Sequence, residues 1–147
     1  MLVVLDTGPL GLVTNPRSDG EAAECSLWLE DLLTRGISVR VPEIADYELR
    51  RELLRANRTL GLARLDALDA ALGLLLIDTT VMRKAAEFWA SARNQGRQTA
   101  DDKALDGDMI LSAQAALIAT NDVTVVATTN VGHLSLFCDA RLWSEIH

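Results

Sequence analysis

Aromatic residues are scarce in this sequence, making up only 4% of its 147 residues. Proteins that hold single-stranded nucleic acid without sequence preference stack bases on aromatic side chains, so we expect no such stacking platform here. Positive charge is scarce as well, because 14 basic residues against 21 acidic ones give a net charge of -7. This balance argues against a protein that holds nucleic acid by its overall charge, which would be basic.

Long hydrophobic runs and clustered cysteines are missing too. No apolar segment approaches the roughly 20 residues that span a bilayer, and no positive stretch precedes the first apolar run, so we expect neither a membrane span nor a signal peptide. The two cysteines, Cys25 and Cys138, lie far apart without a metal-ligand spacing. We expect them to be reduced thiols in a cytoplasmic protein.

Segments with strand and helix character alternate along the chain. Short apolar runs predict strands at residues 2–5, 37–41, 74–78 and 123–129, with a last edge strand at 137–143. Helical spacing predicts helices at residues 19–36, 42–57, 61–73, 81–96 and 108–121, with an exposed loop at 97–107. This alternation predicts an α/β protein with a parallel sheet, and the length suits one domain of residues 1–147.

The stretch "LVVLDTGPL" places Asp6 directly after the first predicted strand. Its "DTG" tripeptide also presents the catalytic carboxylate of aspartic proteases, but small aspartic proteases consist almost entirely of strands. Helix-forming sequence dominates here, and no Asn-Gly or Gly-Gly hairpin turn separates alternating runs, so the protease interpretation is rejected. A phosphatase of the haloacid dehalogenase type needs a second acid two residues later, where this chain has Gly8. A receiver domain needs a Lys after the "VTVV" strand, and none follows.

Oxygen-bearing side chains from separate segments are predicted to meet at one edge of the sheet. Asp6 ends the first strand, and Glu48 lies in the helix that follows the second. Asp106 and Asp108 flank Gly107 where a helix begins, and Asn130 follows the last long strand. In an open parallel sheet, ligands bind outside the carboxyl ends of the strands, which is where these residues converge.

Local roles explain each of these residues singly. The roles are helix or turn capping for Asp6, Asp106, Asp108 and Asn130, or an exposed ion pair with Arg51 or Arg55 for Glu48. Capping does not explain why all of them lie at one edge. Carboxylates within a few Å raise one another's pKa unless a cation lies between them, and oxygen-only ligands select Mg²⁺ or Mn²⁺ over Zn²⁺. The pattern therefore indicates a divalent-metal site.

The chain resembles PIN-domain ribonucleases, many of which are VapC-type toxins of VapBC toxin–antitoxin modules. Four motifs carry the resemblance in order and spacing over nearly the whole chain, namely "VVLDTGPL", "VPEIADYELRRELLR", "LDGDMILSAQA" and "VVATTNVGHL". The resemblance implies a three-layer α/β/α sandwich around a parallel sheet. It also implies an endoribonuclease that depends on Mg²⁺ or Mn²⁺, with RNA as substrate, an antitoxin protein as partner, and assembly as a homodimer.

Carried over by position, the resemblance makes Asp6, Glu48 and Asp108 catalytic residues and metal ligands, with Asp106 as an additional ligand. The fourth acidic position of the family is occupied here by Asn130, which supplies an oxygen without a charge. Two hydroxyl residues, Thr7 and Thr128, match positions that often hold a carboxylate or a water in such proteins.

Three arginines of the Glu48 segment, Arg50, Arg51 and Arg55, are candidate contacts for the RNA backbone. A solvated or partner-facing helix surface explains them equally well. His133 is a general-base candidate, although a lone histidine near a turn is more often structural. A PIN-like module that binds RNA or protein without catalysis is the main rival interpretation, favoured by the acidic net charge and by Asn130.

Overall fold

The computed structural model describes residues 1–17, 19–95 and 102–147, with residues 102–104 described by their backbone alone. Within these ranges, five strands form one sheet in the order β3-β2-β1-β4-β5, and every pair is parallel. The strands are β1 (Leu2–Leu5), β2 (Ser38–Pro42), β3 (Leu74–Leu75), β4 (Thr124–Thr128) and β5 (Ala140–Leu142). The predicted α/β class with a parallel sheet is confirmed.

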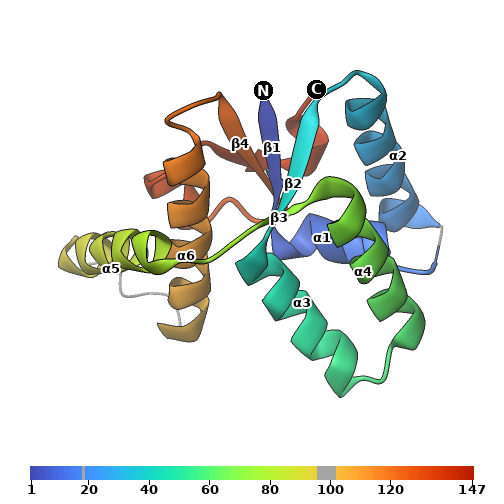
Figure 1. Ribbon diagram of the computed structural model, residues 1–147, viewed down its shortest axis with the longest axis horizontal. Helices are drawn as coiled ribbons and strands as arrows, with labels where there is room; N and C mark the ends of the chain where they lie inside the picture. The colour runs from blue at the N-terminus through green and yellow to red at the C-terminus, as the bar shows by residue number, and fades with distance from the viewer. Residues whose placement is uncertain (18, 96–101) are drawn as a thin grey trace.

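Helices cover both faces of the sheet (Figure 1). They are α1 (Thr7–Thr14), α2 (Gly20–Thr34), α3 (Glu43–Arg55), α4 (Thr59–Leu72), α5 (Thr79–Asn94) and α6 (Asp102–Ile118), with short 3-10 helices η1 (Leu134–Leu136) and η2 (Trp143–Glu145). One face packs against α1, α2 and α4, and the other packs against α6, with α5 outside α6. This is the expected three-layer α/β/α sandwich.

The central strand β1 packs against the helix layers on both faces of the sheet. Val3 and Leu5 point into the core formed with α1, α2 and α4, whereas Leu2 and Val4 point into the core formed with α6. Successive side chains of a strand alternate between the two faces, so a strand buried on both faces must be apolar throughout. Burial of all four residues therefore fixes β1 in the middle of the sandwich, with its carboxyl end leading directly to Asp6.

One helix was not predicted, and one predicted loop was wrong in part. Helix α1 was not expected, because its sequence contains two glycines and a proline; it forms because Asp6 caps it, Pro9 lies in its first turn, and Leu10 is fully buried. The segment 97–107 was expected to be a loop, but α6 already begins at Asp102. Burial of Leu105 against α5 stabilises this polar first part of the helix. Residues 97–101 lie outside the described residues.

The remaining differences are small. The expected strand at 74–78 is reduced to the two residues of β3, and the edge strand within 137–143 is confirmed as β5. Both cysteines carry free thiols, as predicted. Among the helices that the structure describes, none is long and apolar enough to cross a bilayer.

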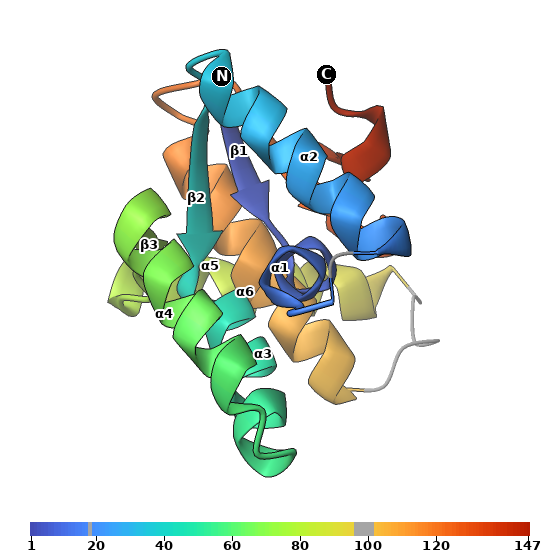
Figure 2. The same cartoon turned by 90° about the vertical axis from the view of Figure 1, so that its right-hand side faces the viewer.

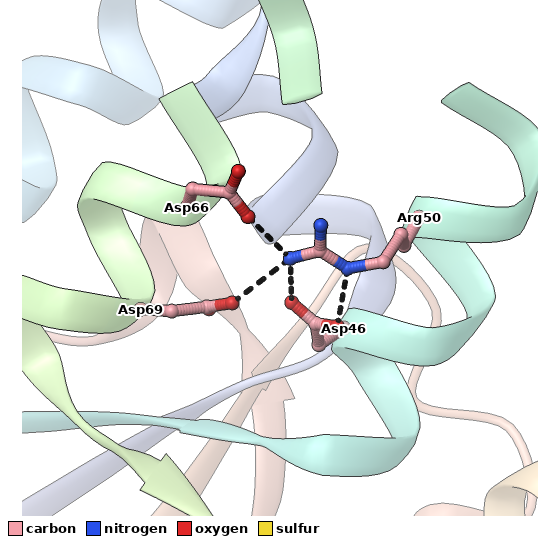
Figure 3. Close-up of polar contacts among 4 residues, drawn as sticks. All are labelled: Asp46, Arg50, Asp66 and Asp69. Carbon is pink, nitrogen blue, oxygen red and sulfur yellow. Dashed lines mark hydrogen bonds and ion pairs between the residues drawn. The ribbon is translucent and has the colours of Figure 1, made fainter. Parts of the chain in front are cut away.

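Helices α3 and α4 extend beyond the carboxyl ends of the strands as a pair (Figure 2). The guanidinium of Arg50 joins them, because its Nε lies 3.0 Å from Asp46 Oδ1 and its Nη2 lies 2.8 Å from Asp66 Oδ1 and 3.3 Å from Asp69 Oδ2 (Figure 3). Burial and the neighbouring Asp46 raise the pKa of Asp69 to about 7. One cation thus holds together three carboxylates that would otherwise repel each other.

Arg50→Ala should therefore destabilise the protein. Removing the guanidinium leaves three carboxylates close together, and we expect a loss of about 2 kcal/mol in the free energy of unfolding, measured in urea near neutral pH. Arg55→Ala is the matched control, because Arg55 is exposed and, of the residues that the structure describes, pairs with the exposed Glu52 alone. It should change stability by less than about 0.5 kcal/mol. Equal losses in the two variants would contradict a structural role for Arg50.

Candidate functional site

The candidate site lies at the point where the chain changes direction across the sheet. From β1 the chain runs to β2 and β3 on one side, and it later returns to β4 and β5 on the other side of β1. In open parallel sheets, ligands bind at the carboxyl ends of neighbouring strands whose connections leave in opposite directions, and we call this region between β1 and β4 the crevice. Asp6 follows β1 at this crevice, and Thr128 ends β4 beside it.

Asp6 accepts two short hydrogen bonds. The backbone N–H of Thr7 donates to Oδ1 at 2.7 Å, and the hydroxyl of Thr128 donates to Oδ2 at 2.7 Å. Asp6 is thus the N-cap of α1 and also a carboxylate of the crevice. Its capping role is compatible with a role in the site. Burial raises the pKa of Asp6, and the hydrogen bonds from Thr128 and Thr7 lower it in part.

Glu48 reaches the same crevice from α3. Its Oε1 accepts a hydrogen bond of 3.1 Å from the hydroxyl of Thr7, the residue next to Asp6. A Cβ atom on Gly107 would lie 3.0 Å from Glu48 Oε2, so the absence of a side chain at Gly107 leaves room for the carboxylate against α6. Burial raises the pKa of Glu48, and the charge of Asp6 raises it further.

Asp108 completes the group from α6. Burial raises the pKa of Asp108 to about 6, with further contributions from the negative charges of Asp6 and Glu48. Among the described residues, no group donates a hydrogen bond to the Asp108 carboxylate. Within the described part of the chain, negative charge on Asp108 is therefore not stabilised by a hydrogen bond. We call Asp6, Glu48 and Asp108 the carboxylate trio.

A divalent cation suits the trio chemically. Three carboxylates from separate elements are oxygen ligands, and a hard cation would relieve their repulsion. In the described part of the chain, however, no three His, Cys, Asp or Glu side chains are grouped closely enough to hold a metal ion. The three carboxylates are close enough to influence one another's charge but too far apart to coordinate one ion as they stand. To bind a cation, they would have to move closer together.

Other residues predicted for the site lie elsewhere or at its edge. Asp106 is exposed and lines a separate cavity of about 390 Å³ with Met82, Trp89 and Met109 between α5 and α6, so the structure separates it from the trio. Asn130 is exposed after β4; its backbone N–H donates to Thr128 Oγ1 at 3.1 Å. His133 is half-buried in the turn before η1.

The three candidate RNA-binding arginines have different surroundings. Arg50 forms ion pairs with the aspartates of α3 and α4 (Figure 3). These contacts are enough to hold its side chain in place, so no nucleic acid is needed to explain its position. Arg55 donates two hydrogen bonds to Glu52 Oε2, at 2.8 and 3.0 Å. Arg51 lies 4.0 Å from Glu48 Oε2, at the edge of the trio. Arg51 is thus the arginine of this helix that the structure places beside the site.

Three residues near the crevice were not predicted from the sequence. They are Gly8 and Gly107, which leave space for neighbouring side chains, and Tyr47, which lies beside Arg51. A Cβ on Gly8 would collide with the side chain of Thr129, so α1 packs directly against the segment after β4. Gly107 leaves space for Glu48 in the same way. Neither glycine lay in a helix predicted from the sequence, because α1 was not expected and residues 97–107 were expected to be a loop. Tyr47, whose ring lies under Arg51, gave no signal in the sequence.

Comparisons with known proteins identify the fold. No family model and no curated protein matches the sequence. Among solved structures, VapBC2 from Rickettsia felis, bound to a DNA fragment from its promoter, matches with a TM-score of 0.72 and 16% identity over 97% of this chain and 99% of that one. VapBC-1 from nontypeable Haemophilus influenzae matches with a TM-score of 0.70 and 14% identity over 99% and 100%.

FitAcB from Neisseria gonorrhoeae matches with a TM-score of 0.68 and 19% identity, over 98% of this chain and 99% of that one. These likenesses extend over nearly the full length of every chain compared. At such low identities they establish the fold, and it is the PIN-type fold of VapC proteins that the sequence resemblance implied.

Asp108→Asn should stabilise the metal-free protein at alkaline pH. Its folded-state pKa of about 6 lies above the ordinary 3.8. The folded chain therefore binds the proton more tightly than the unfolded chain, and wild-type stability falls as the pH rises from about 4 to about 6. We expect a gain on the order of 1 kcal/mol for Asp108→Asn at about pH 8 that disappears near pH 4, measured by urea unfolding with EDTA. The exposed Asp106→Asn is the control and should show no such pH-dependent gain.

Proposed function

We propose that this protein is an endoribonuclease that depends on Mg²⁺ or Mn²⁺ and serves as the toxin of a toxin–antitoxin module. The observation that carries the proposal is the carboxylate trio at the carboxyl ends of a parallel sheet: burial raises the pKa of all three acids, the charge of Asp6 raises that of Glu48 further, and the charges of both raise that of Asp108. An uncompensated group of this kind is typical of a functional site rather than of a structural one.

The structural neighbours add support of a different kind. VapBC complexes are the type of module that the sequence resemblance implies, and FitAcB shares the same fold. A toxin of such a module would be inhibited by a small antitoxin protein that covers the site, and we propose a partner of this class. We also propose RNA as the substrate and a homodimer as the assembly, both carried over from the resemblance.

Roles for the side chains follow from their contacts. Asp6, Glu48 and Asp108 would hold the cation, which when bound supplies Lewis acidity toward the phosphate and a water of lowered pKa. Thr128 fixes Asp6 and Thr7 fixes Glu48, so each of these carboxylates is oriented by a hydroxyl. The reaction we propose is in-line hydrolysis of an RNA phosphodiester that leaves a 5′-phosphate and a 3′-hydroxyl.

The second candidate function is a PIN-like module that binds RNA or protein without cleaving it. Asn130 favours this alternative because it is exposed and uncharged at the family's fourth acidic position. The open spacing of the trio favours it too, since the described acidic side chains form no ready metal group. Cleavage that a chelator abolishes distinguishes the enzyme from the binding module, whereas metal binding alone does not.

Asp6→Asn and Asp108→Asn should each lower RNA cleavage in Mn²⁺ at least about 100-fold, because each removes a charge that the cation needs. Asparagine also caps helices well, so Asp6→Asn retains α1 and tests the site alone. Asp106→Asn is the matched control on the same helix and should retain activity. Cleavage of labelled RNA is the measurement, and wild-type rates in both site variants would end the proposal.

Gly107→Ala should separate stability from activity. Alanine is a better helix former, so the free energy of unfolding should rise by about 0.5 kcal/mol or more. The new Cβ would meet Glu48 Oε2 at 3.0 Å and displace the carboxylate, so cleavage should fall about tenfold. Gly11→Ala in α1 is the control, because among the described residues its Cβ would come nearest to Leu49 at 3.7 Å, an ordinary contact. Full activity in Gly107→Ala would show that the position of Glu48 is unimportant.

A further inference from the structure

We infer that Arg51, stacked on Tyr47, binds a phosphate of the nucleic-acid strand that enters the carboxylate trio. The inference rests on the proposed function, because it assigns a substrate contact to the same site. It goes further by selecting one of the three arginines of α3 and by giving the exposed ring of Tyr47 a role in positioning it.

The geometry of the pair is the first argument. The guanidinium carbon of Arg51 lies 5.2 Å from the centroid of the Tyr47 ring, one helical turn earlier on the same face. Tyr47 is 57% exposed and the Arg51 side chain 54% exposed, so neither belongs to the core. Stacking on an aromatic ring limits the orientations of a guanidinium, and here it directs the group to the edge of the trio.

The unused donors of Arg51 are the second argument. Its Nη2 lies 4.0 Å from Glu48 Oε2, a distance at which charges attract without a hydrogen bond. Across the described residues, the guanidinium of Arg51 donates no hydrogen bond, whereas those of Arg50 and Arg55 donate to carboxylates at 2.8 to 3.3 Å. Arg51 therefore keeps its planar set of donors available for an anion.

The charge of the site is the third argument. A phosphate that approaches three carboxylates is repelled, and a cation at the entrance reduces that repulsion. A guanidinium matches two phosphate oxygens with parallel N–H groups, which a lysine ammonium cannot do. Arg51 supplies this group beside Glu48, in a chain that is acidic as a whole.

The test compares variants of the full chain in two assays. The first assay measures KM, kcat and the salt dependence of cleavage of a short mixed-sequence RNA in Mn²⁺. The second measures binding of the same fluorescein-labelled RNA in EDTA by anisotropy, which requires no cleavage. The variants are Arg51→Ala, Arg51→Lys, Tyr47→Leu and Tyr47→Phe, with Arg35→Ala and Arg55→Ala as controls that remove the same charge elsewhere. Urea unfolding verifies that each variant is folded.

We expect Arg51→Ala to raise KM and weaken RNA binding about tenfold, with kcat changed less than about threefold. The slope of log affinity against log salt should decrease by about 0.7, the value for one phosphate contact on a single strand. Arg51→Lys and Tyr47→Leu should be intermediate, and Tyr47→Phe should resemble the wild type because the ring is retained. Neither control should change KM more than about twofold.

The outcomes separate this inference from the proposed function. If RNA is cleaved but Arg51→Ala matches Arg55→Ala or Arg35→Ala, the inference is wrong and the proposed nuclease stands. If RNA is bound but not cleaved, and Arg51→Ala weakens the binding specifically, the nuclease proposal is wrong and the phosphate contact stands. If the wild type neither binds nor cleaves RNA, both are wrong. A tenfold effect in Tyr47→Phe would overturn the stacking role of the ring.

Discussion

Repulsion among three half-buried carboxylates is the constraint around which the crevice is organised. Asp6, Glu48 and Asp108 come from elements far apart in the sequence; the charge of Asp6 raises the pKa of Glu48, and the charges of Asp6 and Glu48 raise the pKa of Asp108. A fold designed for stability alone would separate them or pair each with a cation. This protein instead orients two of them with hydroxyls and leaves the third without a hydrogen-bond donor from its described residues. Clustered carboxylates of this kind lower stability and are typical of functional sites.

Helix α3 shows how a stable element can carry such a destabilising group. One side of the helix is fixed to α4 through Arg50 and three aspartates, and another side presents Glu48 to the crevice. The guanidinium of Arg50 contacts all three carboxylates of the ion-pair network, whereas the described residues include no cation that contacts all three members of the trio. Acidic residues of α3 therefore serve two different groups: Asp46 belongs to the ion-pair network that joins α3 to α4, and Glu48 belongs to the carboxylate trio.

Much of this architecture could be predicted from the sequence, because apolar runs and helical periodicity report burial directly. The convergence of Asp6, Glu48 and Asp108 followed from the rule that parallel strands end at one edge. The helix α1 could not be predicted, since its glycines and proline oppose a helix and only tertiary packing of Leu10 and the Asp6 cap form it. The separation of Asp106 from Asp108 depends on which side of α6 each faces, and the beginning of that helix was itself missed.

Asp6 both caps α1 and lies in the carboxylate trio, and this combination has a consequence for the evolution of related proteins. If this chain is the nuclease proposed above, a lineage that lost the activity would still be selected to keep Asp or Asn at position 6, because the N-terminus of α1 needs a cap. Asp108 makes no such structural hydrogen bond with the described residues, so we expect it to be substituted by an uncharged residue first. Survival of the acid at position 108, rather than at position 6, is therefore the better diagnostic that a distant homologue has remained active.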